Sequence, residues 1–315
     1  MTRTSRVVAC LAIVGSLTAI AASPASAGRY PKMLRPSHGA YFGTYVKPRG
    51  SESAEQAIKR VERKVGRRFR VDHRYYKWNS SFPNSYDRWT WNQHRIVFAN
   101  WNAQKQNGTV TTWRSIASGR SDALIRTRAR AIRAWGHPMY LTFHHEPEND
   151  GAYGNPSDYV AAFRHIVSIF RAQGVHNVAF VWTLMGSSFI EHTAARWYPG
   201  DRFVDFVASD SYNWYPGRPG VRWRSFKRGV GPTVAFGATH NRPVIIAEYG
   251  VQEDPRTPGR KGRWFRDALA ALRGWPRVKA VMYFDSPTIY PWITDSSRSS
   301  LRGYRTLARS AWMRP

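Results

Sequence analysis

Short apolar runs alternate with segments of helical periodicity along most of the chain. Eight runs have the length and composition of buried strands: residues 39–46, 68–73, 95–101, 139–145, 177–184, 204–212, 243–249 and 278–285. Between them, apolar residues spaced three or four apart predict helices over residues 53–66, 121–135, 155–174 and 263–273, with a closing helix over residues 301–311. No tight hairpin turn joins any strand to the next, so the alternation indicates parallel strands connected by crossover helices.

Eight strand–helix units in one chain predict a (β/α)8 TIM barrel, a fold that typically takes about 250 residues. A doubly wound open sheet is the alternative. That fold would place a glycine-rich phosphate-binding turn after the first strand, and the segment from Gly39 to Gly43 does not have this pattern. No internal repeat or linker divides the sequence. We therefore expect one α/β domain over residues 28–315.

The first 27 residues have the pattern of a secretory signal peptide. Arg3 and Arg6 form a basic start, residues 7–22 are mostly apolar, and Ala25-Ser26-Ala27 is a small-residue cleavage site. The only cysteine, Cys10, lies in this segment, so the mature protein would contain no disulfide. We expect a secreted, extracellular protein without a membrane anchor, and most simply a monomer.

The chain is strongly basic, with a formal net charge of +28 and an arginine-rich balance. Such a field attracts polyanions. The basic residues are spread along the whole sequence and form no known nucleic-acid-binding module, so we expect no nucleic acid partner. The aromatic content is more informative. The chain has 14 Trp, 16 Tyr and 15 Phe, enough to fill a core and also to supply rings that stack on sugar faces.

Two of the predicted strands end in a glutamate. The run Met139–Phe143 leads through His144 and His145 to Glu146, and the very apolar run from Pro243 ends at Glu248. In a parallel barrel, catalytic groups lie at the C-terminal ends of the strands. The fourth and seventh strands lie across the barrel mouth from each other, so these two carboxylates are predicted to face one another.

A facing pair of carboxylates is the machinery of glycoside hydrolysis. In a retaining enzyme the two groups lie about 5–5.5 Å apart, one acting as nucleophile and the other as acid and then base. We assign Glu146 as acid/base and Glu248 as nucleophile. His145 is expected to bind sugar or orient its neighbours, and Tyr212 and Tyr249 are expected to hold Glu248 ionised through their hydroxyl groups. His144, which alternates away from His145, should face the packing shell.

Three motifs in this order resemble glycoside hydrolase family 26. They are Phe143-His144-His145-Glu146, the segment from Asp210 to Trp214, and Ile246-Ala247-Glu248-Tyr249-Gly250. The family includes endo-β-1,4-mannanases, lichenases and β-1,3-xylanases. The resemblance implies a retaining barrel with its acid/base on strand four and its nucleophile on strand seven. The sequence departs from it at Pro147-Glu148, where mannanases of the family more often have Met-Asn-Gly, and this departure bears on the substrate.

The resemblance also implies that Asp210 and Tyr212 bind the sugar hydroxyls and the nucleophile. Other candidates follow from position. Trp101, at the end of strand three, either stacks on the sugar beside the cleaved bond or belongs to the core. Trp214 and Trp292 are further candidates for sugar platforms. His73, expected at the end of strand two, either bonds a hydroxyl or is structural.

We therefore expect a secreted endo-β-1,4-mannanase-like hydrolase, with mixed-linkage β-glucan or β-1,3-xylan as alternative substrates. No cofactor and no metal are expected, because the sequence lacks the paired histidines of zinc proteases and the carboxylate spacing of calcium loops. An alternative from another class is a non-catalytic cationic barrel that binds anionic cell-envelope polymer.

Overall fold

Eight parallel strands follow one another around a closed ring in the computed structural model, which describes residues 30–315. Each strand pairs with the next along the chain, and β1 also pairs in parallel with β8, which closes the ring. The predicted (β/α)8 barrel is confirmed. The strands are β1 (Tyr41–Val46), β2 (Val71–Tyr76), β3 (Ile96–Trp101), β4 (Met139–Phe143), β5 (Val178–Met185), β6 (Phe206–Asn213), β7 (Val244–Val251) and β8 (Val278–Pro287), with a short antiparallel β9 (Pro291–Trp292) paired to β8.

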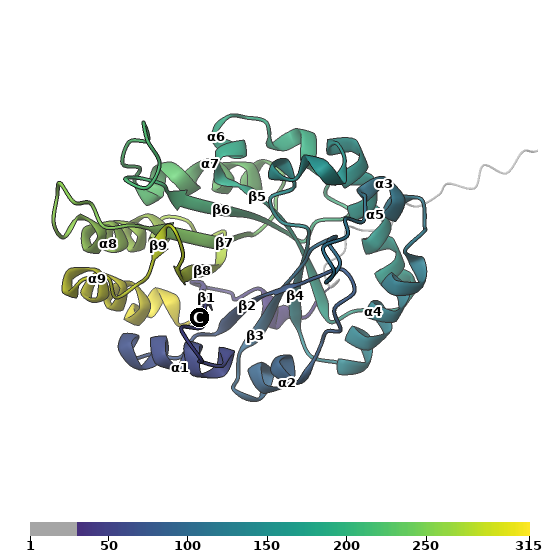
Figure 1. Ribbon diagram of the computed structural model, residues 1–315, viewed down its shortest axis with the longest axis horizontal. Helices are drawn as coiled ribbons and strands as arrows, with labels where there is room; N and C mark the ends of the chain where they lie inside the picture. The colour runs from purple at the N-terminus through teal and green to yellow at the C-terminus, as the bar shows by residue number, and fades with distance from the viewer. Residues whose placement is uncertain (1–29) are drawn as a thin grey trace, which may run out of the picture.

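Helices lie outside this ring of strands (Figure 1). They are α1 (Ala54–Val65), α2 (Ser85–Asn92), α3 (Trp113–Ala117), α4 (Asp122–Trp135), α5 (Pro156–Ala172), α6 (Gly186–Ile190), α7 (Phe226–Thr239), α8 (Arg260–Arg273) and α9 (Arg298–Arg309). A capping box starts α1: the Ser53 side chain accepts from the Gln56 amide, and the Gln56 side chain accepts from the Ser53 amide. The same helix ends at Gly66 in the left-handed conformation.

The interior of the barrel is filled by buried side chains from β2 to β8, and the partly buried Tyr41 of β1 packs against them. These include Phe98, Tyr140 and Met282, none more than 1% exposed. Tyr140 donates its hydroxyl to the carbonyl of Leu34, so the N-terminal turn η1 (Lys32–Leu34) is fixed to the barrel interior. Two larger clusters lie between the strands and the helices. The strands are therefore held from both sides, and the loops at their C-terminal ends rest on a rigid base.

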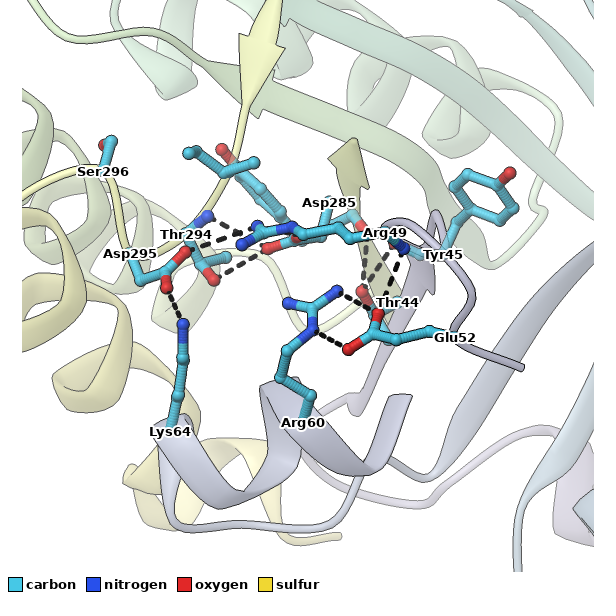
Figure 2. A network of polar contacts seen from close by, with 12 residues as sticks. Thr44, Tyr45, Arg49, Glu52, Arg60, Lys64, Asp285, Thr294, Asp295 and Ser296 are labelled. Carbon is cyan, nitrogen blue, oxygen red and sulfur yellow. Dashed lines mark hydrogen bonds and ion pairs between the residues drawn. The ribbon is translucent and has the colours of Figure 1, made fainter. Parts of the chain in front are cut away.

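A polar network joins the loop after β1 to the segment after β8 (Figure 2). Arg49 lies between Asp285 and Asp295, 3.6 Å from a carboxylate oxygen of each. Asp285, 1% exposed at the end of β8, accepts from the amide and the hydroxyl of Thr294 at 3.0 and 2.8 Å. Lys64 pairs with Asp295. The network therefore fixes residues 293–296, which directly follow Trp292.

Several boundaries differ from the sequence prediction. The second strand was expected at residues 68–73, and β2 runs from Val71 to Tyr76, so His73 lies inside the strand. Two segments for which the sequence analysis predicts no helix contain one: residues 76–93 include α2, and residues 214–240 include α7. Pro232 and the glycines of α7 conceal its helical pattern, because both residue types are unfavourable inside helices.

The predicted signal peptide, residues 1–27, lies outside the described residues. Within residues 30–315, no helix is long and apolar enough to cross a bilayer.

Candidate active site

Glu146 is presented by a sharp bend that follows β4. The strand ends at Phe143, and His144 and Glu146 both have left-handed backbones, with φ of 47° and 50°. Such conformations are uncommon for residues other than glycine and concentrate at functional sites. The amide of Glu146 donates to the carbonyl of Thr183 on β5 at 3.2 Å, and Pro147 starts the turn η2 (Pro147–Asn149). The bend thus turns the carboxylate away from the strand direction and towards the barrel mouth.

Glu248, on β7, is held by two tyrosines from different strands. Tyr75 on β2 donates its hydroxyl to Oε1, and Tyr212 on β6 donates to Oε2. The Glu248 residue is only 4% exposed. Each carboxylate oxygen therefore has a defined donor, and the group is fixed in orientation. Two donors on separate strands hold both oxygens in place, as a nucleophile aimed at one carbon requires.

His145 and Asp210 connect the two glutamates. Nδ1 of His145 lies 2.8 Å from Oδ2 of Asp210 and 3.6 Å from Oε1 of Glu248. Ligand atoms of His145, Glu146 and Asp210 all lie within 4.8 Å of one another. Asp210 and Glu248 are also direct neighbours in the pairing of β6 with β7. The structure therefore brings together Glu146, Glu248, His145, Asp210 and Tyr212 at one end of the barrel, as the sequence predicted.

The protonation of this cluster is set mainly by burial. Burial raises the pKa of Glu146 well above its usual range; the charge of Asp210 raises it further, and the charges of Glu248 and Glu148 add to this against an opposing effect of His145. Burial likewise raises the pKa of Asp210, followed by the charges of Glu248 and Glu148. The adjacent pair Glu146–Asp210 therefore retains a proton to higher pH than a free carboxyl group, which suits a general acid.

His144 faces away from the cluster, as expected. It is fully buried, and its Nδ1 accepts from the Ala103 amide and from the Trp113 indole, both at 3.3 Å. Since Nδ1 accepts, the proton lies on Nε2, which donates to Asp150 at 2.7 Å. Burial lowers the pKa of His144, consistent with a neutral ring. His144 fixes the bend that carries Glu146.

Two of the sequence candidates lie below the site. Trp101 is fully buried, stacks on Trp78 at 4.3 Å between ring centroids, and donates its indole N–H to the Trp78 carbonyl at 3.0 Å. It is a core residue, with no ring face left for a sugar. His73 is 1% exposed, and its Nδ1 lies 3.2 Å from the carbonyl of Ala247. Its burial places it under Tyr75, whose ring it stacks on at 4.6 Å.

The tryptophans after β6 and in β9 lie beside Tyr212. Trp292, 3% exposed, is 4.9 Å from the Tyr212 ring and 5.3 Å from Trp214. It supports Tyr212 from behind. Trp214 is half-buried at the rim, which leaves it as the better placed of the two to meet a ligand.

Tyr75 is the site residue that the sequence analysis missed. Residues alternate across a strand, so placing β2 at its observed position would have put Val71, His73 and Tyr75 on one face, with Tyr75 nearest the strand end. Tyr249, expected to bind Glu248, points the other way. It lies in the cluster outside the strands, 6.1 Å from Trp264, and its hydroxyl has no hydrogen-bond partner among residues 30–315.

The cluster of His145, Glu146 and Asp210 has the donor atoms of a cation site. The 2.8 Å approach of His145 to Asp210 is, however, that of a hydrogen bond, and it accounts for their proximity without an ion.

Comparison with known proteins agrees with this geometry. Residues 141–218, which carry Glu146, His145, Asp210 and Tyr212, match the family model described as Glycosyl hydrolase family 26. Over this segment the chain resembles glycosyl hydrolase family 26, as its sequence motifs indicated. Endoglucanase H of Acetivibrio thermocellus is 32% identical over 286 residues, which are 85% of this chain and 30% of the relative. The chain thus spans less than a third of that relative's length.

Solved structures of mannanases share the barrel. A modular endo-β-1,4-mannanase from Cellulomonas fimi superposes with a TM-score of 0.63 at 16% identity, over 90% of this chain and 74% of that one. A β-mannanase from a symbiotic protist of the termite Reticulitermes speratus gives a TM-score of 0.63 at 15% identity, over 89% of each chain. At these identities the likeness shows the fold.

The segment that departs from the family 26 mannanase pattern has a structural role here. Oε1 of Glu148 accepts from the Met185 amide and from the Ser188 hydroxyl, both at 2.7 Å. Glu148 thereby ties the turn after Glu146 to the end of β5 and to α6. Burial raises the pKa of Glu148, and its charge in turn raises the pKa of Glu146.

Proposed function

We propose that the chain is a secreted, retaining glycoside hydrolase that cleaves β-linked polysaccharide. The observation that carries the proposal is the contrast between two carboxylates at one barrel mouth. Glu248 is fixed by two tyrosine donors, while burial and neighbouring acids raise the pKa of Glu146. Environments that separate an acid from a nucleophile in this way are what a double displacement needs.

In the first step, Glu248 attacks the anomeric carbon as Glu146 gives its proton to the leaving glycosidic oxygen, which produces a covalent glycosyl–enzyme. In the second step, Glu146, now ionised, takes a proton from water, and the resulting hydroxide oxygen displaces Glu248. His145, oriented by Asp210, is placed to bind a sugar hydroxyl beside the reacting carbon.

The proposed substrate is β-mannan, cleaved at internal bonds of the polysaccharide. Support comes from the resemblance to family 26 and from the mannanase activity of a structural neighbour. Mixed-linkage β-glucan is the second candidate, favoured by the name of the endoglucanase relative. Because this chain corresponds to 30% of that relative, the name can describe another part of it. β-1,3-Xylan is the third substrate to test.

The test is product analysis on mannan, lichenan and β-1,3-xylan. Wild type should release reducing ends from one of them, with the β-anomer appearing first, whereas Glu248→Ala should release none while keeping its circular dichroism spectrum. Glu146→Ala should still cleave a nitrophenyl glycoside of the preferred sugar, since a good leaving group needs no proton. Full turnover of polysaccharide by Glu248→Ala would remove the assignment. Salt-sensitive polymer binding without any reducing ends would favour the cationic binding protein.

Secretion and a monomeric state belong to the same proposal. N-terminal sequencing of protein recovered from the culture medium should begin at Gly28, and sedimentation should give the mass of one chain. A retained segment 1–27 would contradict the first expectation.

A further inference from the structure

One face of Trp214, a candidate sugar platform, is covered by a guanidinium group. The guanidinium carbon of Arg218 lies 3.4 Å from the centroid of the Trp214 ring. Tyr290 and Trp292 contact the same indole nearly edge-on, with interplanar angles of 79° and 77°. At this position a ligand therefore meets a cation held on an aromatic ring.

The backbone is built to hold Arg218 there. Its amide donates to the carbonyl of Trp214 at 3.1 Å, which closes a tight turn. Within that turn, a Cβ on Gly217 would lie 2.5 Å from the Gln252 amide nitrogen and 2.6 Å from the Tyr290 ring. A larger residue at this position would have to displace both side chains, so the turn packs closely against Tyr290 and against Gln252, which follows β7. The arginine is thus positioned by packing on both sides.

The guanidinium of Arg218 is available to a ligand. It is exposed, and in the part of the chain that the structure describes no carboxylate forms an ion pair with it. The segment 214–225 contains Arg218, Arg222 and Arg224 and no acidic residue. An arginine pre-organised on an aromatic face loses little freedom on binding, and its planar fork matches a carboxylate.

This cation lies next to the reacting centre. The Trp214 ring is 5.1 Å from the ring of Tyr212, and the Tyr212 hydroxyl donates to Glu248. A sugar adjoining the one attacked by Glu248 would therefore approach Arg218. The net charge of +28 acts in the same direction, since it raises the local concentration of polyanions.

We propose that Arg218, held on Trp214, recognises a carboxylate on the substrate, and that the preferred polysaccharide is a β-linked glycan bearing uronic acid groups. This inference rests on the proposed hydrolase function and specifies the chemistry of its substrate.

The test uses one polymer in two forms: β-mannan partially oxidised at C6 to uronate, and the same preparation after reduction of its carboxyl groups. Wild type should show a higher kcat/KM on the oxidised form. Arg218→Gln should lose this advantage, roughly three- to tenfold and mainly in KM, as expected for one partly exposed bidentate pair. On the reduced form it should match wild type. High salt should weaken the wild-type preference.

Arg222→Gln is the matched control, because it removes the same charge from the same exposed segment without a ring contact. It should keep the preference. Equal rates of wild type on both polymers would overturn the inference, as would equal losses in the two variants, which would indicate only a diffuse charge effect. An equal loss by Arg218→Gln on the reduced polymer would also overturn it, since Arg218 would then only support Trp214.

Binding separates this inference from the proposed function. Affinity electrophoresis of Glu248→Ala, with and without Arg218→Gln, measures recognition of both polymers without turnover. If wild type hydrolyses no β-glycan, the proposed function fails, and the retardation of Glu248→Ala by oxidised over reduced polymer still decides whether Arg218 binds carboxylate. No difference in retardation would refute the site.

Discussion

Tyr212→Phe removes one hydrogen-bond donor from the proposed nucleophile and leaves the ring in place. The Tyr212 hydroxyl donates to Oε2 of Glu248, a residue only 4% exposed, so water cannot readily replace the lost donor. A hydrogen bond to a charged group contributes about 1.5–3 kcal/mol. Because about 1.4 kcal/mol corresponds to a factor of ten in rate, kcat/KM should fall by roughly 10- to 150-fold.

Steady-state release of reducing ends, on whichever β-glycan wild type cleaves, measures this loss. Tyr75→Phe should cause a loss of similar size, since Tyr75 donates to the other oxygen of Glu248. Tyr249→Phe is the matched control. Tyr249 adjoins Glu248 in sequence, but its buried hydroxyl has no partner within residues 30–315, so the activity should stay within about twofold of wild type. Full activity in folded Tyr212→Phe, or an equal loss in Tyr249→Phe, would refute the reasoning.

Three further outcomes are expected. Asp210→Asn removes a charge that raises the pKa of Glu146, so the alkaline limb of the pH–rate profile should move to lower pH, and an unmoved limb would contradict the assignment of Glu146 as acid. Glu62→Gln leaves Arg95, 1% exposed, without its ion-pair partner. We expect a loss of about 3–5 kcal/mol in the free energy of unfolding and a melting temperature lower by roughly 6–20 °C in calorimetry, whereas a change under about 1 kcal/mol would show that the pair is dispensable. Burial lowers the pKa of Lys261 to about 8, so the unfolded chain binds more protons than the folded one between about pH 8 and 10.5, and stability should rise with pH in that window. Urea unfolding of wild type and Lys261→Met measures this: between about pH 8 and 10.5, the free energy of unfolding of wild type should rise by up to ~3 kcal/mol relative to the variant. If the two stabilities change with pH in parallel, the ammonium of Lys261 is not desolvated in the folded state.

The barrel could be predicted because its strands are short, apolar and separated by polar turns. Apolar periodicity and chain order were enough to put Glu146 and Glu248 at the ends of strands four and seven. The misplaced residues lie in strands, where a shift of one position moves a side chain from the barrel interior to the outside of the ring. An error of three residues in β2 concealed Tyr75, and the assignment of Tyr249 to the nucleophile ignored the alternation after Glu248.

Tertiary context decided the remaining residues. A tryptophan at a strand end has the same local sequence whether it meets ligand or core, so the burial of Trp101 under Trp78 could not be read from the sequence. In the same way, the local sequence does not indicate that the Arg218 guanidinium lies over the Trp214 ring, because that position depends on the packing of Gly217 against Tyr290. The helix α7 was hidden by its own glycines and Pro232, which packing tolerates although propensity does not.

The seam at which the ring closes has a consequence for biosynthesis. The hydroxyl of Thr44 on β1 donates to the carbonyl of Tyr283 on β8 at 2.8 Å, a contact spanning 239 positions. At a ribosomal rate of about 5–20 residues per second, the first strand waits roughly 10–50 s for its last neighbour. During that interval two strand edges remain unpaired and open to association with other nascent chains. Chaperone dependence during translation should therefore end only when β8 and the network around Arg49 have emerged and docked.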